Sequence, residues 1–225
     1  MINTKTLSLL NELEKNNNRK WFEAHKDQYN EHKKDFEEII DELSYAVAQF
    51  DDAVKEGLMN EKRITKSFRV YRDIRFSKDK TPYKTNMSGF ISYDVTTPHS
   101  PAYYLSIQPG GRSMIGGGLW MPDAPTLKKI RKYIDAHPDK LKKIEQDRSF
   151  KELFPQGIDR SDVLKTSPRG FSADHEAIKY LQLKSFTASI KFSDKQVLQK
   201  DFLTKVQRSF KTLVKLNMWI KKAVR

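Results

Sequence analysis

The chain has 225 residues, with 42 Lys or Arg against 29 Asp or Glu and no Cys, so its formal net charge is +13. Its length, 37% hydrophobic content and 11% aromatic content argue against intrinsic disorder. The absence of Cys excludes disulfides, iron–sulfur clusters, thiolate zinc sites and Cys nucleophiles. No apolar run approaches the ~20 residues that span a bilayer, and the N-terminus lacks a signal-peptide core, which predicts a soluble cytoplasmic protein without a membrane partner.

The first 60 residues are predicted to form a helical layer. Leu7, Leu10 and Leu13 give a short apolar stripe, and Asn18 is placed to cap a long helix over about residues 19–50. Apolar side chains recur at 3.6-residue spacing through that stretch. This layer is acidic, because residues 1–60 hold 13 Asp or Glu and 8 Lys or Arg.

The pattern changes to a period of two in residues 61–120, which predicts a strand-rich centre. Residues 63–76 alternate as a strand with Phe68 and Arg72 on its apolar face. Residues 102–108 and 114–120 are predicted to pair as an antiparallel hairpin around a Pro-Gly-Gly turn.

The triplet Gly116-Gly117-Gly118 falls inside the returning strand of this hairpin. Glycine in a strand weakens it and has no side chain to pack. The triplet therefore indicates a bulge, or a place where another backbone or a ligand comes close.

Residues 121–225 are predicted to be mainly helical with one further strand, over 186–192. Helices are expected from Asp123 and from Asp139, and a closing helix over 198–224; Asp174 is placed to cap another. Because strands group in the middle with helices before and after, we expect one α+β domain over 1–225. Its central, mainly antiparallel sheet would be packed by the N-terminal, middle and C-terminal helices.

The stretch from Arg72 to Lys84 concentrates cations beside a proline-containing loop. Guanidinium groups bind phosphate or carboxylate bidentately, and Lys adds a mobile point charge. Arg72 falls on the apolar face of its predicted strand, so it needs an anionic partner or a pocket. Asp73 cannot serve directly, because neighbouring strand residues point to opposite faces.

Three interpretations of this stretch stay open: a site for a small anion, a nucleic-acid surface, or internal pairing with the acidic helix over residues 19–50. The spacing alone does not choose among them. The candidate anion-binding residues are Arg72, Arg75, Lys80, Tyr83, Lys84 and Arg169.

A second candidate segment runs from Lys165 to His175. Asp174 and His175 stand at a predicted helix start, where an imidazole can act as acid or base near neutral pH. The helix amides, with Arg169 nearby, can also hold an anion. The alternative is ordinary capping by Asp174 with His175 exposed. Lys184 and Ser185 would line the same side.

The strands also carry aromatic residues, among them Tyr103, Tyr104 and Trp120. Such side chains can stack bases on an open sheet face, although aromatics in strands are more often core. No zincin, Walker, nucleophile-elbow or dinucleotide motif is present, so the sequence predicts no metal site and identifies no cofactor.

These residues together resemble an uncharacterised family called domain of unknown function 2461. The resemblance rests first on Arg72-Asp73, the run from Arg75 to Lys80, and Pro82-Tyr83-Lys84. Further matching pieces are Asn17, Trp21-Phe22, Tyr29, Tyr103-Tyr104-Leu105, Gly116-Gly117-Gly118, Arg131, Pro168-Arg169-Gly170-Phe171, Asp174-His175 and Lys184-Ser185-Phe186. It spans roughly residues 7–215 and implies one full-length domain, but it implies no activity.

We therefore expect a protein that binds a phosphate- or carboxylate-bearing ligand in a basic pocket. An enzyme acting on that ligand would use Asp174 and His175 as its acid–base groups. Two alternatives are kept: a nucleic-acid-binding module that uses a basic face, and an interaction or scaffold protein whose cations are paired internally. The ligand, the oligomeric state and the reaction, if any, are not predicted.

Overall fold

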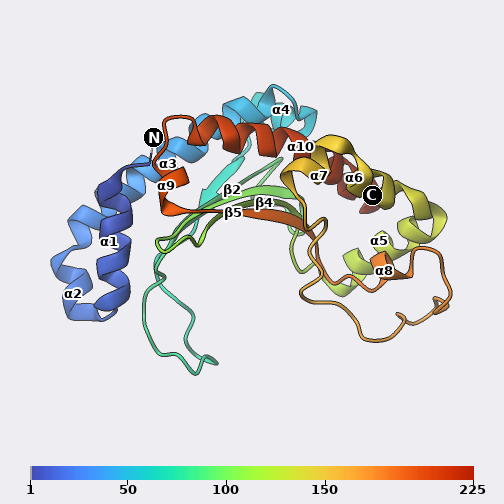
Figure 1. Cartoon of the computed structure of the whole chain (residues 1–225), viewed down its shortest axis with the longest axis horizontal. Coiled ribbons are helices and arrows are strands. Elements are labelled where there is room, and N and C mark those ends of the chain that lie inside the picture. The colour runs from blue at the N-terminus through green and yellow to red at the C-terminus, as the bar shows by residue number, and fades with distance from the viewer. Residues whose placement is uncertain (1) are drawn as a thin grey trace.

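The computed structural model describes residues 2–225 and folds as one α+β domain, as the sequence predicts (Figure 1). The N-terminal helices are α1 (Thr4–Lys15), α2 (Arg19–Ala24), α3 (Lys26–Ala48) and α4 (Asp52–Met59). The strands are β1 (Thr65–Ser67), β2 (Met87–Ser92), β3 (Ala102–Ile107), β4 (Ser113–Leu119) and β5 (Phe186–Phe192). The remaining helices are α5 (Ala124–Ala136), α6 (Pro138–Gln146), α7 (Arg148–Leu153), α8 (Ile178–Leu181), α9 (Asp194–Val197) and α10 (Phe202–Ala223).

The five strands form one sheet in the order β1-β2-β3-β4-β5, and every neighbouring pair is antiparallel. The predicted hairpin is confirmed as β3 and β4, and the predicted strand over 186–192 is confirmed as β5. Gly110 and Gly111 turn the β3–β4 hairpin with positive φ angles of 77° and 69°, which glycine adopts without a steric penalty.

One face of the sheet is covered by α3 and α10, which lie across it in Figure 1. Ile91, Tyr103, Leu105 and Ile115 point to this side and are buried. The ring of Tyr103 packs against Phe210 of α10. This is the main core of the domain, and it follows from the alternation of side chains along each strand.

The glycine triplet of β4 lets this layer approach closely. A Cβ on Gly117 would stand 2.9 Å from Leu213 Cδ1 of α10. A Cβ on Gly118, whose φ is +118°, would stand 2.0 Å from the carbonyl oxygen of Phe186 on β5. The predicted close approach of another backbone is therefore confirmed.

The opposite face of the sheet is left open between two long connections (Figure 1). One is the loop between β1 and β2, residues 68–86, which we call the basic loop because it holds six Lys or Arg and two Asp. The other is the segment 154–185 between α7 and β5, which includes α8.

The predicted helix over residues 19–50 is wrong in one respect, because it is broken into α2 and α3 at His25. The His25 ring stacks on Trp21, and its Nδ1 lies 2.8 Å from the Trp21 carbonyl oxygen. The imidazole thus provides a partner for a carbonyl that a helix end leaves without one.

The predicted strand over residues 63–76 is confirmed only over β1, Thr65–Ser67, and is wrong beyond Ser67. The chain then pairs with itself: the Arg72 amide donates to the Pro82 carbonyl at 2.9 Å, and the Lys84 amide donates to the Val70 carbonyl at 2.7 Å. Residues 70–72 and 82–84 therefore form the stem of the basic loop. A strand needs a partner along its length, and β2 begins only at Met87.

The helix that Asp174 was expected to cap is reduced to the single turn of α8, which begins after Ala177. The side-chain oxygens of Asp174 therefore do not cap it. The segment around Asp174 is a series of turns in which the His175 amide donates to the Ser172 carbonyl.

Candidate ligand site on the uncovered sheet face

The uncovered face of the sheet is the floor of a cavity of about 710 Å³, which we call the trough. Strand alternation places on this face the side chains that the helices do not cover. The floor is made by Ser88, Phe90, Ala102, Tyr104, Met114, Gly116, Gly118, Thr187 and Ser189, and the sides include Phe68, Lys84, Asn86, His99, Ser100, Trp120 and Asp159. A cavity of this size suits a small organic ligand.

The floor has an aromatic half over β1 to β3. The Phe68 ring lies 5.7 Å from the Phe90 ring and 6.4 Å from the Tyr104 ring, and Phe90 stands opposite Tyr104 in the β2–β3 register. All three rings keep exposed surface. The planes of these two ring pairs are inclined by 42° and 65°, so the cluster offers apolar ring faces and edges against which an unsaturated ring can pack.

The other half of the floor, over β4 and β5, is made of small residues. Gly116 faces Tyr104 on one side and Ser189 on the other, and Gly118 faces Thr187. Neither glycine adds a side chain to this part of the floor, and a Cβ at either would meet β5, 3.0 Å from the Ala188 carbonyl oxygen at Gly116 and 2.0 Å from the Phe186 carbonyl oxygen at Gly118. The hydroxyls of Thr187 and Ser189 can orient a polar ligand by hydrogen bonds.

Lys84 is the cation that reaches the trough. Its Nζ lies 5.3 Å from the centre of the Phe68 ring and donates to the Arg69 carbonyl at 3.0 Å. Burial, and then the neighbouring charge of Arg69, lower the pKa of the Lys84 amine. A half-buried amine beside a cavity, with a neutral carbonyl as its partner, retains charge with which to attract an anion.

A second, polar cavity of about 400 Å³ lies beside the trough and shares Lys84 and Asn86 with it. Its lining also includes Glu14, Asn17, Arg72, Asp79, Thr81, Tyr83 and Thr85. Three of the predicted anion-binding residues, Arg72, Tyr83 and Lys84, are therefore brought together around one cavity.

Arg72 already has partners inside the basic loop. Its guanidinium donates to Asp79 and to the Thr81 hydroxyl. These contacts, led by the bond from Arg72, lower the pKa of Asp79 to about 2. Arg72 thus meets a carboxylate and also faces a cavity, although the carboxylate comes from its own loop and not from the acidic helix.

Arg75 and Lys80 lie at the exposed tip of the basic loop, away from Lys84. The Arg75 guanidinium donates to both carboxylate oxygens of Asp73, at 2.9 and 2.7 Å. This pairing lowers the pKa of Asp73. Lys80 Nζ donates to the Ile74 carbonyl at 3.0 Å. Neither residue lines the trough in this arrangement.

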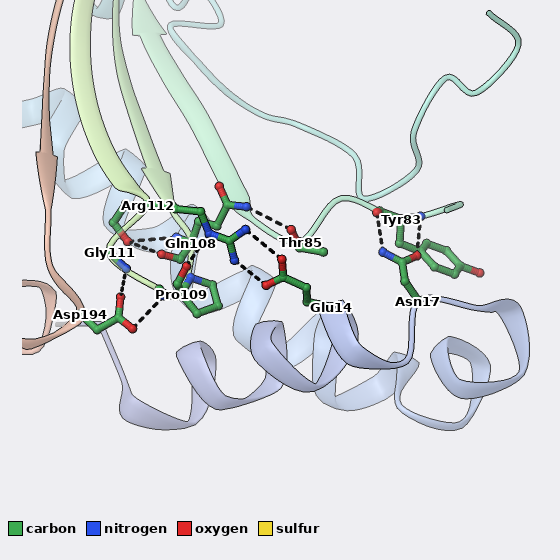
Figure 2. A network of polar contacts seen from close by, with 11 residues as sticks. Glu14, Asn17, Tyr83, Thr85, Gln108, Pro109, Gly111, Arg112 and Asp194 are labelled. Atoms are coloured by element: carbon green, nitrogen blue, oxygen red, sulfur yellow. Dashed lines mark hydrogen bonds and ion pairs between the residues drawn. The ribbon is translucent and has the colours of Figure 1, made fainter. Parts of the chain in front are cut away.

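Tyr83 anchors the basic loop to the N-terminal helices. Its buried ring stacks on Phe22 with 4.1 Å between the ring centres. The Asn17 side chain donates to the Tyr83 carbonyl at 2.9 Å and accepts from the Tyr83 amide at 3.0 Å, as Figure 2 shows. This pair of bonds fixes the loop directly before Lys84.

The same polar network holds the β3–β4 turn (Figure 2). Arg112 donates to both carboxylate oxygens of Glu14 on α1, and Asp194 accepts from the amides of Gly110 and Gly111, both at 2.9 Å. Gln108 donates to the Thr85 hydroxyl at 3.1 Å. These hydrogen bonds therefore fix the base of the basic loop and the β3–β4 end of the sheet relative to each other and to α1.

The second predicted segment lies apart from this site. Arg169 and Asp174 are exposed in the segment 154–185. The partner of His175 is Asp135 of α5, whose Oδ1 lies 3.1 Å from Nε2, while Nδ1 accepts from the Ala177 amide at 3.0 Å. Neither Asp174 nor His175 lines the trough. Their predicted acid–base role is not supported by this placement.

Lys184 and Ser185 have structural partners. Lys184 Nζ donates to Asp162 at 2.6 Å, within the segment 154–185. The buried Ser185 hydroxyl accepts from the Met121 amide at 2.9 Å. The Ser185 contact connects the segment to the chain that directly follows β4.

The histidine that does line the trough is His99, which the sequence did not single out. Its Nε2 lies 3.4 Å from Oδ2 of Asp123, the residue that caps α5. His99 has a φ of +54°, a conformation that non-glycine residues rarely adopt and that is frequent at functional sites. The only signal in the sequence is a histidine in the loop directly before β3.

Among residues 2–225, no three His, Asp or Glu side chains gather closely enough to hold a metal ion. Within the same described range, no helix is both long and apolar enough to cross a bilayer.

Comparison with known proteins identifies a family. The model of the family described as "Conserved hypothetical protein (DUF2461)" matches residues 5–219. No curated protein and no solved structure matches the chain.

Proposed function

The chain belongs to the DUF2461 family, whose description names no activity, and we propose that it binds an organic anion with a flat unsaturated ring in the trough. The carrying observation is the position of Lys84. Its amine stands where the aromatic half of the trough meets the polar cavity of Arg72. A ligand there can stack its ring on the sheet while its phosphate or carboxylate meets the ammonium group.

The aromatic half supports the ring. Tyr104 and Phe90 present partly exposed rings from adjacent strands, and Phe68 packs beside them. Aromatic contacts of this kind prefer offset or edge-to-face geometry and contribute about 0.5–1.5 kcal/mol beyond the burial of area. The floor thus favours flat ligands over branched aliphatic ones.

The charges around the junction support the anion. Lys84 has a carbonyl as its hydrogen-bond partner, whereas Arg72 and Arg75 are paired with carboxylates of their own loop. The two arginines favour the alternative of internally paired cations, but Lys84 does not. We accordingly assign the anion contact to Lys84. Arg72 would be a second contact if its guanidinium exchanged the bond to Asp79 for a bond to the anion of the ligand.

A matched set of probes tests the proposal. Adenosine monophosphate carries a ring and an anion, ribose 5-phosphate carries only the anion, and adenosine carries only the ring. The expected result in thermal denaturation is greater stabilisation by adenosine monophosphate than by either part, reaching about 2.7 kcal/mol at 100 times its dissociation constant. Benzoate against acetate repeats the comparison for a carboxylate.

Two aromatic variants locate the effect. Tyr104→Ala is expected to abolish the advantage of adenosine monophosphate over ribose 5-phosphate. Tyr45→Ala, which removes a 60% exposed ring from α3 on the covered side of the sheet, is expected to change nothing. The proposal is wrong if no ring-bearing anion stabilises the protein more than its ringless counterpart, or if the two variants behave alike.

We further propose a cytoplasmic location, which the lack of Cys favours.

A further inference from the structure

Exposed aromatic rings stand at two separate places along the trough. The first is the cluster of Phe68, Phe90 and Tyr104. The second is Trp120, which follows β4, lines the trough and is 62% exposed. Tyr104 stands opposite Gly116, four residues before Trp120. At roughly 3.3 Å per residue the two places are about 13 Å apart along the strand.

This separation exceeds the size of a single base or comparable ring. Both places can be filled at once only by a ligand that carries at least two rings joined by a spacer. The small residues between them, Gly116 and Gly118, leave the floor clear along that path.

Cations stand at both edges of the same face. Lys66 of β1 lies opposite Phe90 in the register, and Lys191 of β5 lies opposite Met114. Both side chains are exposed. With Lys84 they give three ammonium groups spread across the open face, more than a single small anion needs.

We propose that the ligand of the trough is a single-stranded nucleic acid, whose bases stack on the Tyr104 cluster and on Trp120 while its phosphates lie near Lys66, Lys84 and Lys191. This inference rests on the proposed function, because it identifies the flat-ringed anion as a nucleotide unit of a strand. Base stacking on aromatic side chains together with a cationic path for the backbone is how sequence-tolerant single-strand binding proteins work.

The basic loop adds to this surface. Phe76 at its tip is 96% exposed, and the Arg75 guanidinium lies 5.9 Å from its ring. The loop extends on the uncovered side of the sheet (Figure 1). A duplex has its bases already stacked and paired, so an exposed set of rings favours single strands over duplexes.

The test is the length dependence of binding, measured by fluorescence anisotropy with labelled oligouridine and oligothymidine of 2 to 12 nucleotides. Affinity is expected to rise with length until the strand covers both aromatic places and then to level off. The logarithm of affinity is expected to fall with the logarithm of salt by about 0.7 per phosphate contact. The RNA and DNA arms show which sugar is preferred.

Two variants, each with a control, test whether the strand binds along the trough. Trp120→Ala is expected to weaken the longer strands about 5- to 150-fold, the range for the loss of one stacked base. Its control is Tyr45→Ala. Changing both Lys66 and Lys191 to Gln is expected to reduce the salt slope by about 1.4 in total, whereas changing Lys128 and Lys211, which are exposed on α5 and α10, is not.

Failure of this inference differs from failure of the proposed function. If affinity is the same for one nucleotide as for twelve, or Trp120→Ala has no effect on long strands, the ligand is a single small molecule and only the strand is wrong. If Lys128 and Lys211 control the salt slope, strands bind the helical layer and the inference is again wrong. If adenosine monophosphate shows no advantage over ribose 5-phosphate, the proposed function itself fails.

Discussion

Lys84 illustrates how a single residue acquires its role from its surroundings. In the sequence it is one of six cations in the basic loop. In the structure the Asn17–Tyr83 pair and the loop stem fix the backbone before it, and its side chain then lies over Phe68 at the junction of two cavities. Three other cations of the loop, Arg72, Arg75 and Lys80, have partners close to them in the sequence.

The lowered pKa of Lys84 predicts a pH dependence of anion binding. The ammonium form binds the anion, so affinity for adenosine monophosphate is expected to fall as pH rises through that pKa, below the value of about 10.4 for an ordinary lysine. In Lys84→Arg the charge persists, and the fall is expected to disappear. Isothermal titration across this pH range measures the affinity of the wild type and of Lys84→Arg. If affinity depends on pH identically in both proteins, Lys84 does not contact the anion.

His99 and His175 give a second comparison between residues. His99 lines the trough, whereas His175 does not. His99→Ala is therefore expected to weaken adenosine monophosphate binding by about 2- to 12-fold, the worth of one hydrogen bond, and His175→Ala is expected to leave it unchanged. Equilibrium titration with adenosine monophosphate measures the affinity of both variants. A larger loss of affinity in His175→Ala would place the binding site at the segment 154–185 instead.

Strand β4 matters at the scale of elements because it serves both faces of the sheet. Gly117 admits α10 on the covered side, and Gly116 lines the trough on the other, where a Cβ would stand 3.0 Å from the Ala188 carbonyl oxygen of β5. Gly118 accommodates the backbone of β5. The triplet therefore supports the core and the candidate site together.

This dual role predicts unequal costs of adding a methyl group. Gly118→Ala requires a positive φ and a clash with a backbone carbonyl, so unfolding free energy is expected to drop by more than about 3 kcal/mol. Gly111→Ala has a φ of +69° but meets nothing within 4 Å, and a loss of about 1 kcal/mol is expected. Urea denaturation measures both; similar losses would show that strain alone, without the clash, sets the cost.

The whole molecule depends on long-range contacts that bring the segment 154–185 against the helices. Glu145 of α6 is central to them. It accepts from the Tyr180 hydroxyl at 2.6 Å, from the Ile158 amide at 2.9 Å and from Arg160 at 2.8 Å. Burial raises its pKa, but these three contacts outweigh burial and lower the pKa overall.

The Glu145 contacts predict how stability changes in acid. A carboxylate whose folded-state pKa is lowered stabilises the fold above its unfolded value, about 4.3, and loses that effect as pH falls through the folded value. Glu145→Gln is expected to lose about 1–3 kcal/mol at neutral pH and to show a flatter acid profile. Asp139→Asn, an exposed neighbour on α6, is the control for urea unfolding across pH. An unchanged acid profile in Glu145→Gln would exclude this contribution.

The sequence by itself determined the features that depend on local periodicity and turn chemistry. The β3–β4 hairpin, strand β5, the Asn18 cap and the α+β class were all predicted, because alternation, Pro-Gly-Gly and capping side chains act within a few residues of one another. The family resemblance was likewise readable from the motifs around Arg72 to Lys84.

Only the tertiary structure decided which face of the sheet stays open and which side chains meet there. That Tyr103 is buried under α10 while Tyr104 lies in the trough depends on strand register, since neighbouring residues point to opposite faces. The pairing of His175 with Asp135 and of His99 with Asp123 likewise depends on chain folding. Such contacts join segments whose local patterns carry no information about each other.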